Sequence, residues 1–196
     1  MSAWNDFNDA EQQSTIDLIP KGTVVNVRMT IKPGGHDDRE QGWTGGYATQ
    51  SYDTGSVYLA CEFVVLDGPF NKRKMWTNIG LHSRKGPNWS NMGRSFIRAA
   101  LNSARGVNPQ DNSPAAAAAR RIKGFEELDG LEFVARVDIE KDARGDFRNI
   151  VRSAVEPGQA DYPRNGNTVT QPQSPSPTKP VASSGQTGFN GRPSWA

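Results

Sequence analysis

The chain has 196 residues, of which 35% are hydrophobic, and a formal net charge of +2; this length suits one domain of ordinary size and excludes a large multidomain enzyme. No apolar run reaches the roughly 18 to 20 residues that cross a bilayer, and the acidic stretch MSAWNDFNDAEQQ does not resemble a signal peptide. Because Cys61 is the only cysteine, an internal disulfide framework and a thiolate zinc site are excluded as well. We therefore expect a cytoplasmic protein with no membrane partner.

The charges are distributed unevenly along the chain. Residues 1–20 contain four acidic residues and no Lys or Arg, whereas residues 71–110 contain eight Lys or Arg and no acidic residue. Trp76, Trp89 and Phe96 lie among these cations. Cations that pair with phosphates, beside flat side chains that stack on bases, are typical of nucleic-acid binding. The alternative is a solvated basic face beside aromatic residues of the core.

Three stretches in the first half of the chain alternate apolar with polar residues, as half-buried strands do: 23–31, 57–66 and 73–81. In the third stretch, the register that buries Met75 and Ile79 turns Lys74 and Trp76 outward together. We therefore predict one exposed strand face that carries both a cation and an indole ring.

Residues 32–56, between the first two predicted strands, contain six glycines in 25 residues. Their pattern matches neither a strand nor a helix, so we predict a long loop, and loops of this length are usually functional or mobile. The predicted loop carries three aromatic residues: Trp43, Tyr47 and Tyr52.

The second half of the chain begins with helical patterns. A helical period of apolar residues predicts a helix at 91–105, and Ser113 followed by Pro114 and five alanines predicts the start of a short second helix. The two-residue period then returns in 131–139 and 147–155, which a charged turn joins into a predicted hairpin.

The predicted order is three strands, a helix and two strands. With its long connection between strands one and two, this order indicates a mainly β fold, namely a five-stranded OB-like barrel with the helix between strands three and four. An SH3-like barrel or a sandwich of the same strands stays open as an alternative. We assign residues 1–22 to an N-terminal extension, 23–162 to the OB-like nucleic-acid-binding domain and 163–196 to a tail.

OB barrels bind oligonucleotides on the outer face of strands two and three and on the loops that flank this face. We therefore expect single-stranded DNA as the partner, bound without strong sequence preference, and we expect Trp76 to be the leading stacking residue. The candidate binding residues, taken from the predicted strands, their flanking loops and the acid-free stretch, are Arg28, Trp43, Tyr47, Tyr52, Tyr58, Lys72, Arg73, Lys74, Trp76, Arg84, Lys85, Trp89, Lys141 and Arg144.

The tail has a different composition. Residues 163–196 hold six Pro, four Gly, five Ser and no acidic residue, which is typical of a disordered segment. Near its end, in GFNGRPSWA, the isolated Phe189 and Trp195 are suited to docking into a groove of a replication or recombination protein, or are inert. The oligomeric state stays open, a homo-oligomer included.

Four stretches within residues 4–106 form a recognisable set: WNDFNDAEQQSTIDLIPKG, VRMTIKPGG, GWTGGYAT and GLHSRKGPNWSNMGRSFIRAALNSARG. In these stretches the chain resembles a family of small single-stranded-DNA-binding proteins from phages and mobile elements. The resemblance implies an OB-like domain that coats single strands during replication or recombination. It implies no particular binding residues, and none of the four stretches is a catalytic signature. Unlike the acidic tip of the broader bacterial single-strand binders, the tip of this tail is basic and aromatic.

Two other functions compete with strand binding. A metal-dependent nuclease would use His36, Asp37, Asp38 and Glu40, joined by His82. Four of these residues lie in the predicted glycine-rich loop, however, where nothing would hold metal ligands rigidly. We therefore expect no enzymatic activity, no metal and no cofactor. The second alternative is a structural or protein-interaction subunit whose basic face meets an acidic partner.

Overall fold

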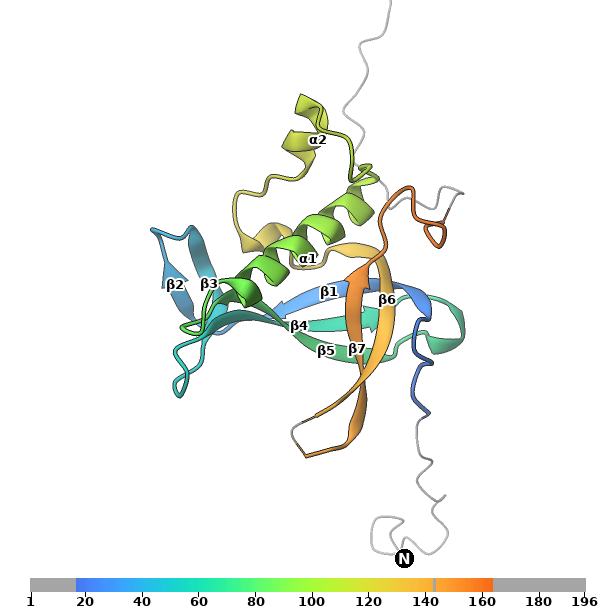
Figure 1. Cartoon of the computed structure of the whole chain (residues 1–196), viewed down its shortest axis with the longest axis horizontal. Coiled ribbons are helices and arrows are strands. Elements are labelled where there is room, and N and C mark those ends of the chain that lie inside the picture. Colours follow the sequence, from blue (N-terminus) through green and yellow to red (C-terminus); the bar gives the residue numbers. More distant parts are fainter. Residues whose placement is uncertain (1–16, 143, 164–196) are drawn as a thin grey trace, which may run out of the picture.

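The computed structural model describes residues 17–142 and 144–163 and has a mainly β fold with one long helix (Figure 1). The strands are β1 (Val24–Lys32), β2 (His36–Asp38), β3 (Trp43–Gln50), β4 (Val57–Val65), β5 (Lys74–His82), β6 (Glu132–Lys141) and β7 (Phe147–Ala154). The helices are α1 (Asn88–Arg105), α2 (Pro114–Ala119) and the short 3₁₀ turns η1 (Gly68–Phe70) and η2 (Phe125–Glu127). No helix of this described part is both long and apolar enough to cross a membrane.

The strands form one antiparallel sheet in the order β2-β3-β4-β1-β6-β7, with β5 paired to β4. The sheet curls strongly, so that β5 and β7 approach each other and α1 packs across β5, β6 and β7 (Figure 1). The result is a curled half-barrel with α1 covering its open side.

The core follows from the alternation along the strands. The inward residues of β1 and β4 are almost fully buried: Val25, Val27, Met29, Ile31, Val57, Leu59, Cys61, Phe63 and Val65. Helix α1 adds Phe96, whose ring meets those of Phe63 and Phe133 edge to face, with centroids 6.2 and 6.1 Å away. Three mutually perpendicular rings of this kind join the helix to both halves of the sheet. The alternation predicted for residues 23–31 and 57–66 is therefore confirmed.

The predicted number of strands is wrong, because the stretch 32–56 is not a loop. It contains the β2–β3 hairpin. The sequence of the hairpin shows no two-residue period, because two glycines interrupt the alternation of side chains in the middle of β3. Gly45 and Gly46 adopt positive φ angles of 82° and 71° there. Seven strands are present in the described part instead of five.

The position of the helix also differs from the prediction. With the hairpin counted, α1 lies between the fifth and sixth strands rather than between the third and fourth, and it begins at Asn88 instead of residue 91. Its first turn is mostly polar and carries no apolar stripe, which is why the helical period missed it. The short helix α2 begins where predicted, since Ser113 Oγ accepts a hydrogen bond from the Ala116 N–H at 3.2 Å.

The chain is already part of the core at Ile19, which is 1% exposed. The Asn149 amide on β7 binds both backbone groups of Ile19, accepting from its N–H and donating to its carbonyl, each at 2.8 Å. The Asn149 side chain thus makes the two hydrogen bonds to the Ile19 backbone that a neighbouring strand would make. The predicted tail, with Phe189 and Trp195, lies almost wholly outside the described residues.

Candidate nucleic-acid interface

The outer side of β4 and β5, with the adjoining parts of β1 and β6, presents a surface that we call the sheet face. It is formed by exposed and half-buried residues: Arg28, Ala60, Glu62, Val64, Lys74, Trp76, Asn78 and Glu132. Trp76 is 55% exposed, while its neighbour Met75 is 1% exposed and Ile79 is 3% exposed. The strand therefore turns Lys74 and Trp76 outward as predicted. In register, Trp76 lies opposite Glu62.

The cations of the sheet face have acidic partners. Lys74 Nζ lies 3.0 Å from Glu62 Oε1, and on the adjoining β1 Arg28 Nε donates to Glu132 Oε1 at 2.9 Å. Exposed pairs of this kind are worth about 0 to 1 kcal/mol. A phosphate can therefore replace the carboxylate at little cost, but the resting charge of the face is close to balanced.

One end of the sheet face is closed by an aromatic pair. The Trp89 indole lies directly on Gly80, where an added Cβ would be only 2.3 Å from Trp89 Cδ2. The Tyr58 ring, opposite Gly80 in register, lies 6.2 Å from the Trp89 ring at a tilt of 50°. Both side chains are at least partly packed against the fold, and their remaining edges extend the aromatic surface.

Helix α1 touches β5 through backbone at the next turn. A Cβ on Gly93 would lie 2.0 Å from the Gly80 carbonyl oxygen. Only glycine permits this approach. The contact fixes the start of α1, and with it Trp89, against the sheet.

The predicted loop aromatics do not gather on the sheet face. Trp43 and Tyr47 are half-buried and pack against the core, and Trp43 lies tilted against His36 with ring centroids 6.3 Å apart. Tyr52 follows β3 and is fully exposed. Of these three residues, only Tyr52 is free to stack on a base without rearrangement.

The remaining predicted cations are spread over several turns. Lys72 is exposed in the β4–β5 turn with a positive φ of 67°, and the neighbouring Arg73 Nη2 donates to the Asp17 carbonyl at 2.7 Å. The Arg84 guanidinium lies against Gly55, where an added Cβ would be 2.8 Å from Cζ, and Lys85 beside it is exposed. Arg73 and Arg84 are therefore partly committed to the fold.

Lys141 and Arg144 belong to the β6–β7 turn. Lys141 Nζ lies 5.1 Å from the centre of the exposed Phe147 ring, a cation–π distance. Arg144 is exposed, and its backbone N–H donates to Asp142 at 2.8 Å. This hairpin tip thus offers one aromatic and two cationic side chains.

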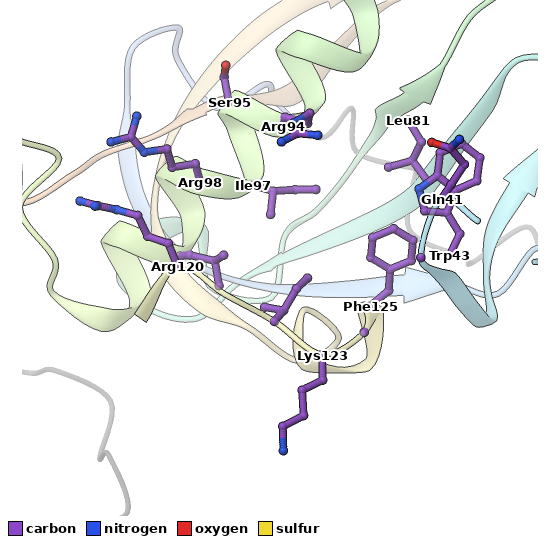
Figure 2. Close-up of a pocket in the computed structure, with 14 residues that line it drawn as sticks. Gln41, Trp43, Leu81, Arg94, Ser95, Ile97, Arg98, Arg120, Lys123 and Phe125 are labelled. Carbon is purple, nitrogen blue, oxygen red and sulfur yellow. The ribbon is translucent and has the colours of Figure 1, made fainter. Parts of the chain in front are cut away.

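A pocket of about 520 Å³ lies between α1, the β2–β3 turn and the segment leading into η2, and we call it the helix pocket (Figure 2). Its cationic lining residues are Arg94, Arg98, Arg120 and Lys123, and its lining includes no Asp or Glu. Sequence reasoning missed this pocket because Arg120 and Lys123 lie beyond the acid-free stretch. The helical spacing of Arg94 and Arg98 was its only visible signal.

Two cations of the helix pocket, Arg98 and Arg120, donate to neutral acceptors. Arg120 donates to Asn102 Oδ1 and to the Asn108 and Asp111 carbonyls at 2.7 to 2.8 Å, and Arg98 donates to the Pro109 carbonyl at 3.1 Å. Neutral acceptors hold these guanidinium groups in place without cancelling their charge. The pocket is therefore an electropositive hollow.

Two carboxylates of the nuclease alternative, Asp37 and Asp38, are used by the fold. Asp37 Oδ1 accepts from the Gly46 N–H at 2.7 Å, and Asp38 Oδ1 accepts from Glu40 and Gln41 N–H groups, so both carboxylates hold the β2–β3 hairpin. His36, Asp38 and His82 line a second pocket of about 330 Å³. Within residues 17–142 and 144–163, no group of three His, Cys, Asp or Glu side chains could hold a metal ion.

The single thiol is equally unsuited to chemistry. Cys61 is 2% exposed, and burial, with the nearby Asp129 charge, raises its pKa to about 12. A thiol of this kind is not a nucleophile near neutral pH.

Comparison of the chain with protein-family models, curated proteins and solved structures gave no significant match.

Proposed function

We propose that the protein binds single-stranded DNA with little sequence preference, and that the sheet face carries the binding. The observation behind this proposal is Trp76, an indole that stands 55% exposed on an open sheet between Lys74 and Asn78. An exposed ring on a strand costs hydration and contributes little to the core. It is well suited to stacking on a base, an interaction worth about 1 to 3 kcal/mol per base.

The proposed fold family is the OB-like barrel. Five of the strands, β1, β4, β5, β6 and β7, have its order, because β1 pairs with both β4 and β6 while α1 links β5 to β6. The β2–β3 hairpin would then be an extension of the first connection. In OB barrels the nucleic acid crosses the sheet face that corresponds here to β4 and β5. The loop between the first two strands of the barrel and the last hairpin flank this face. Tyr52 and the Lys141 hairpin tip occupy those flanking positions in this assignment.

The resemblance to phage and mobile-element binders sets the proposed setting. We place the protein in the cytoplasm, coating single strands during replication or recombination without cutting them. Partner proteins of those processes are proposed to bind the tail.

The direct test is a titration of fluorescent oligo-dT with the full chain at low salt. Trp76→Ala is expected to weaken binding roughly 5- to 100-fold, as loss of one stacked base predicts, and Trp76→Phe to recover most of the affinity. Met92→Ala serves as the control for loss of an exposed apolar side chain, because Met92 is 64% exposed and lies on α1 rather than on a strand of the sheet face. Equal affinity of the parent chain and Trp76→Ala would refute the assigned face.

The salt dependence identifies the kind of partner. Log affinity is expected to fall linearly with log salt, with a slope of about −0.7 per phosphate contact. Absence of oligo-dT binding at low salt would leave the protein-interaction alternative, and equally tight duplex binding would reduce the function to attraction of polyanions. Labelled strands incubated with Mg²⁺ or Mn²⁺ are expected to stay intact.

A further inference from the structure

The helix pocket is lined by both apolar and cationic side chains. Its apolar lining comes from α1, the end of β5 and the segment around η2: Leu81, Ile97, Leu101, Ile122 and Phe125. Four cations belong to the lining, with Arg94 and Arg98 on the α1 side and Gln41 and Trp43 on the opposite side; the Lys123 side chain points away from the apolar side chains (Figure 2). Such a hollow fits a large apolar side chain flanked by carboxylates.

The lining favours a peptide over a nucleotide. A stacked base needs an open ring face, but Phe125 is only 8% exposed and Trp43 is half-buried. The other apolar side chains of the pocket are aliphatic, and these complement an apolar side chain better than they complement a polar base edge.

Two segments of the chain carry isolated aromatic residues outside the described part, and charge decides between them. Trp4 and Phe7 lie among Asp6, Asp9 and Glu11, with no Lys or Arg in residues 1–20. The tail aromatics instead flank Arg192, which has the same sign as the pocket. We propose that the acidic segment 4–11 of the chain docks in the helix pocket of its own domain, with Trp4 or Phe7 on the apolar lining and the carboxylates against the cations.

The length of the chain allows this contact. The backbone enters the described fold at Asp17, whose carbonyl accepts from Arg73. Arg73 directly precedes β5, and Leu81 near the other end of β5 lines the pocket, so the two are about 26 Å apart along the strand. The ten residues from Phe7 to Asp17 span about 35 Å when extended. Segment 4–11 can therefore reach the pocket in an extended form.

The acidic groups near the helix pocket lie outside its lining. Three carboxylates lie near the rim: Asp111 interacts with Arg120, Glu127 accepts from the Lys123 backbone N–H at 2.7 Å and from Arg105, and Glu126 lies against Gly124. None of the three lines the pocket, so the lining itself stays cationic. The inference is independent of the proposed DNA binding, because it concerns another surface and another ligand.

Disulfide trapping in the full chain tests the proposal. Asn8→Cys is combined with Gln41→Cys, which lines the pocket and leaves every cation in place, and Cys61 stays inert because it is buried. The control pairs Asn8→Cys with Lys72→Cys, since Lys72 is exposed beside Arg73, where the segment leaves the fold. Lys72 is nearer than Gln41 to the point where the segment leaves the fold. A segment with no preference would therefore form the disulfide with residue 72 more readily, so faster trapping at residue 41 would indicate docking.

We expect the oxidised monomer to form at least threefold faster in the Gln41→Cys variant than in the Lys72→Cys variant. Adding Asp6→Asn, Asp9→Asn and Glu11→Gln is expected to remove this excess without changing the Lys72 rate. Unchanged circular dichroism and melting temperature establish that each variant is folded.

Other outcomes overturn the proposal. Faster or equal trapping at Lys72 would show that the segment has no preference for the pocket, and a trapped dimer would show exchange between copies instead of docking within one chain. If the disulfide forms equally fast in the Gln41→Cys and Lys72→Cys variants while Arg94→Gln weakens oligo-dT binding severalfold, the pocket binds DNA and not segment 4–11.

Discussion

The sheet face and the helix pocket each take some of their cations from the acid-free stretch 71–110, yet they differ in the partners that these cations have. On the sheet face Lys74 and Arg28 pair with Glu62 and Glu132, while the one large ring stands exposed. In the helix pocket the guanidinium groups bond to carbonyl and amide oxygens, and the apolar side chains lie deep. The number of charged residues in a stretch of sequence therefore does not show where the surface is electropositive, because the carboxylates that pair with these cations come from other strands.

The largest expected effect removes both surfaces at once. In an open helix Gly→Ala stabilises by about 1 kcal/mol, but at Gly93 the new methyl group meets the Gly80 carbonyl at 2.0 Å. We expect Gly93→Ala to destabilise the domain by about 3 kcal/mol, since backbone cannot yield as a side chain does. Urea unfolding measures this change, with Ser95→Ala on the exposed side of α1 as control. A more stable Gly93→Ala protein would contradict the close approach of α1 to β5.

A second comparison sets the two tryptophans of these regions against each other. Trp43 packs on the core beside the helix pocket, so Trp43→Ala is expected to cost about 2 to 3 kcal/mol of unfolding free energy. Trp76→Ala is expected to change it by less than about 0.5 kcal/mol, because the ring stands exposed. Thermal melts of both variants measure the difference. If Trp76→Ala unfolds the domain, the strand register is inverted.

The paired charges of the sheet face can be released individually. Glu62→Gln frees Lys74 from its partner at 3.0 Å and removes a carboxylate next to Trp76. We expect oligo-dT affinity at low salt to rise a few-fold and the salt slope to steepen by about 0.7, as one more phosphate contact predicts. Glu132→Gln, which frees Arg28 further from Trp76, is the graded control. An unchanged slope would mean that Lys74 never meets a phosphate.

The smallest expected effect is on the pH dependence of stability and concerns two carboxylates, Asp111 and Asp138. The Ser113 N–H and hydroxyl lower the pKa of Asp111, near the helix pocket, and the Ile139 N–H, with Lys21, lowers the pKa of Asp138 on β6. A depressed pKa stabilises the fold above the unfolded value near 4 and loses that contribution as pH falls through the folded value. Asp111→Asn and Asp138→Asn are each expected to flatten slightly the decline of stability below pH 4, measured by urea unfolding at pH 3 and 5. A steeper decline would reverse the assigned sign.

The predictable part of the fold was the part that follows a simple period. The β1, β4 and β5 registers and the β6–β7 hairpin follow from alternation, and α2 follows from Ser113 and Pro114. The β2–β3 hairpin could not be predicted in this way, because its glycines break the period and its carboxylates bond to backbone.

The candidate site was predictable only in its local features. Alternation suffices to turn Trp76 outward, since one strand determines it. The pairing of Lys74 with Glu62, and of Arg28 with Glu132, depends on which strands become neighbours. The helix pocket depends on still more distant pieces, because Trp43, Arg94 and Phe125 meet only after the sheet has curled.

The grip of Asn149 on Ile19 has a further consequence for the residues that precede it. Both backbone groups of Ile19 are bound, and its side chain is 1% exposed. The entering chain is therefore fixed in direction as well as in position, because an amide that both donates and accepts fits only one orientation of the backbone beside β7. Asn149→Ala would leave these two backbone groups without their partners, while the buried Ile19 side chain would still hold the chain in the core.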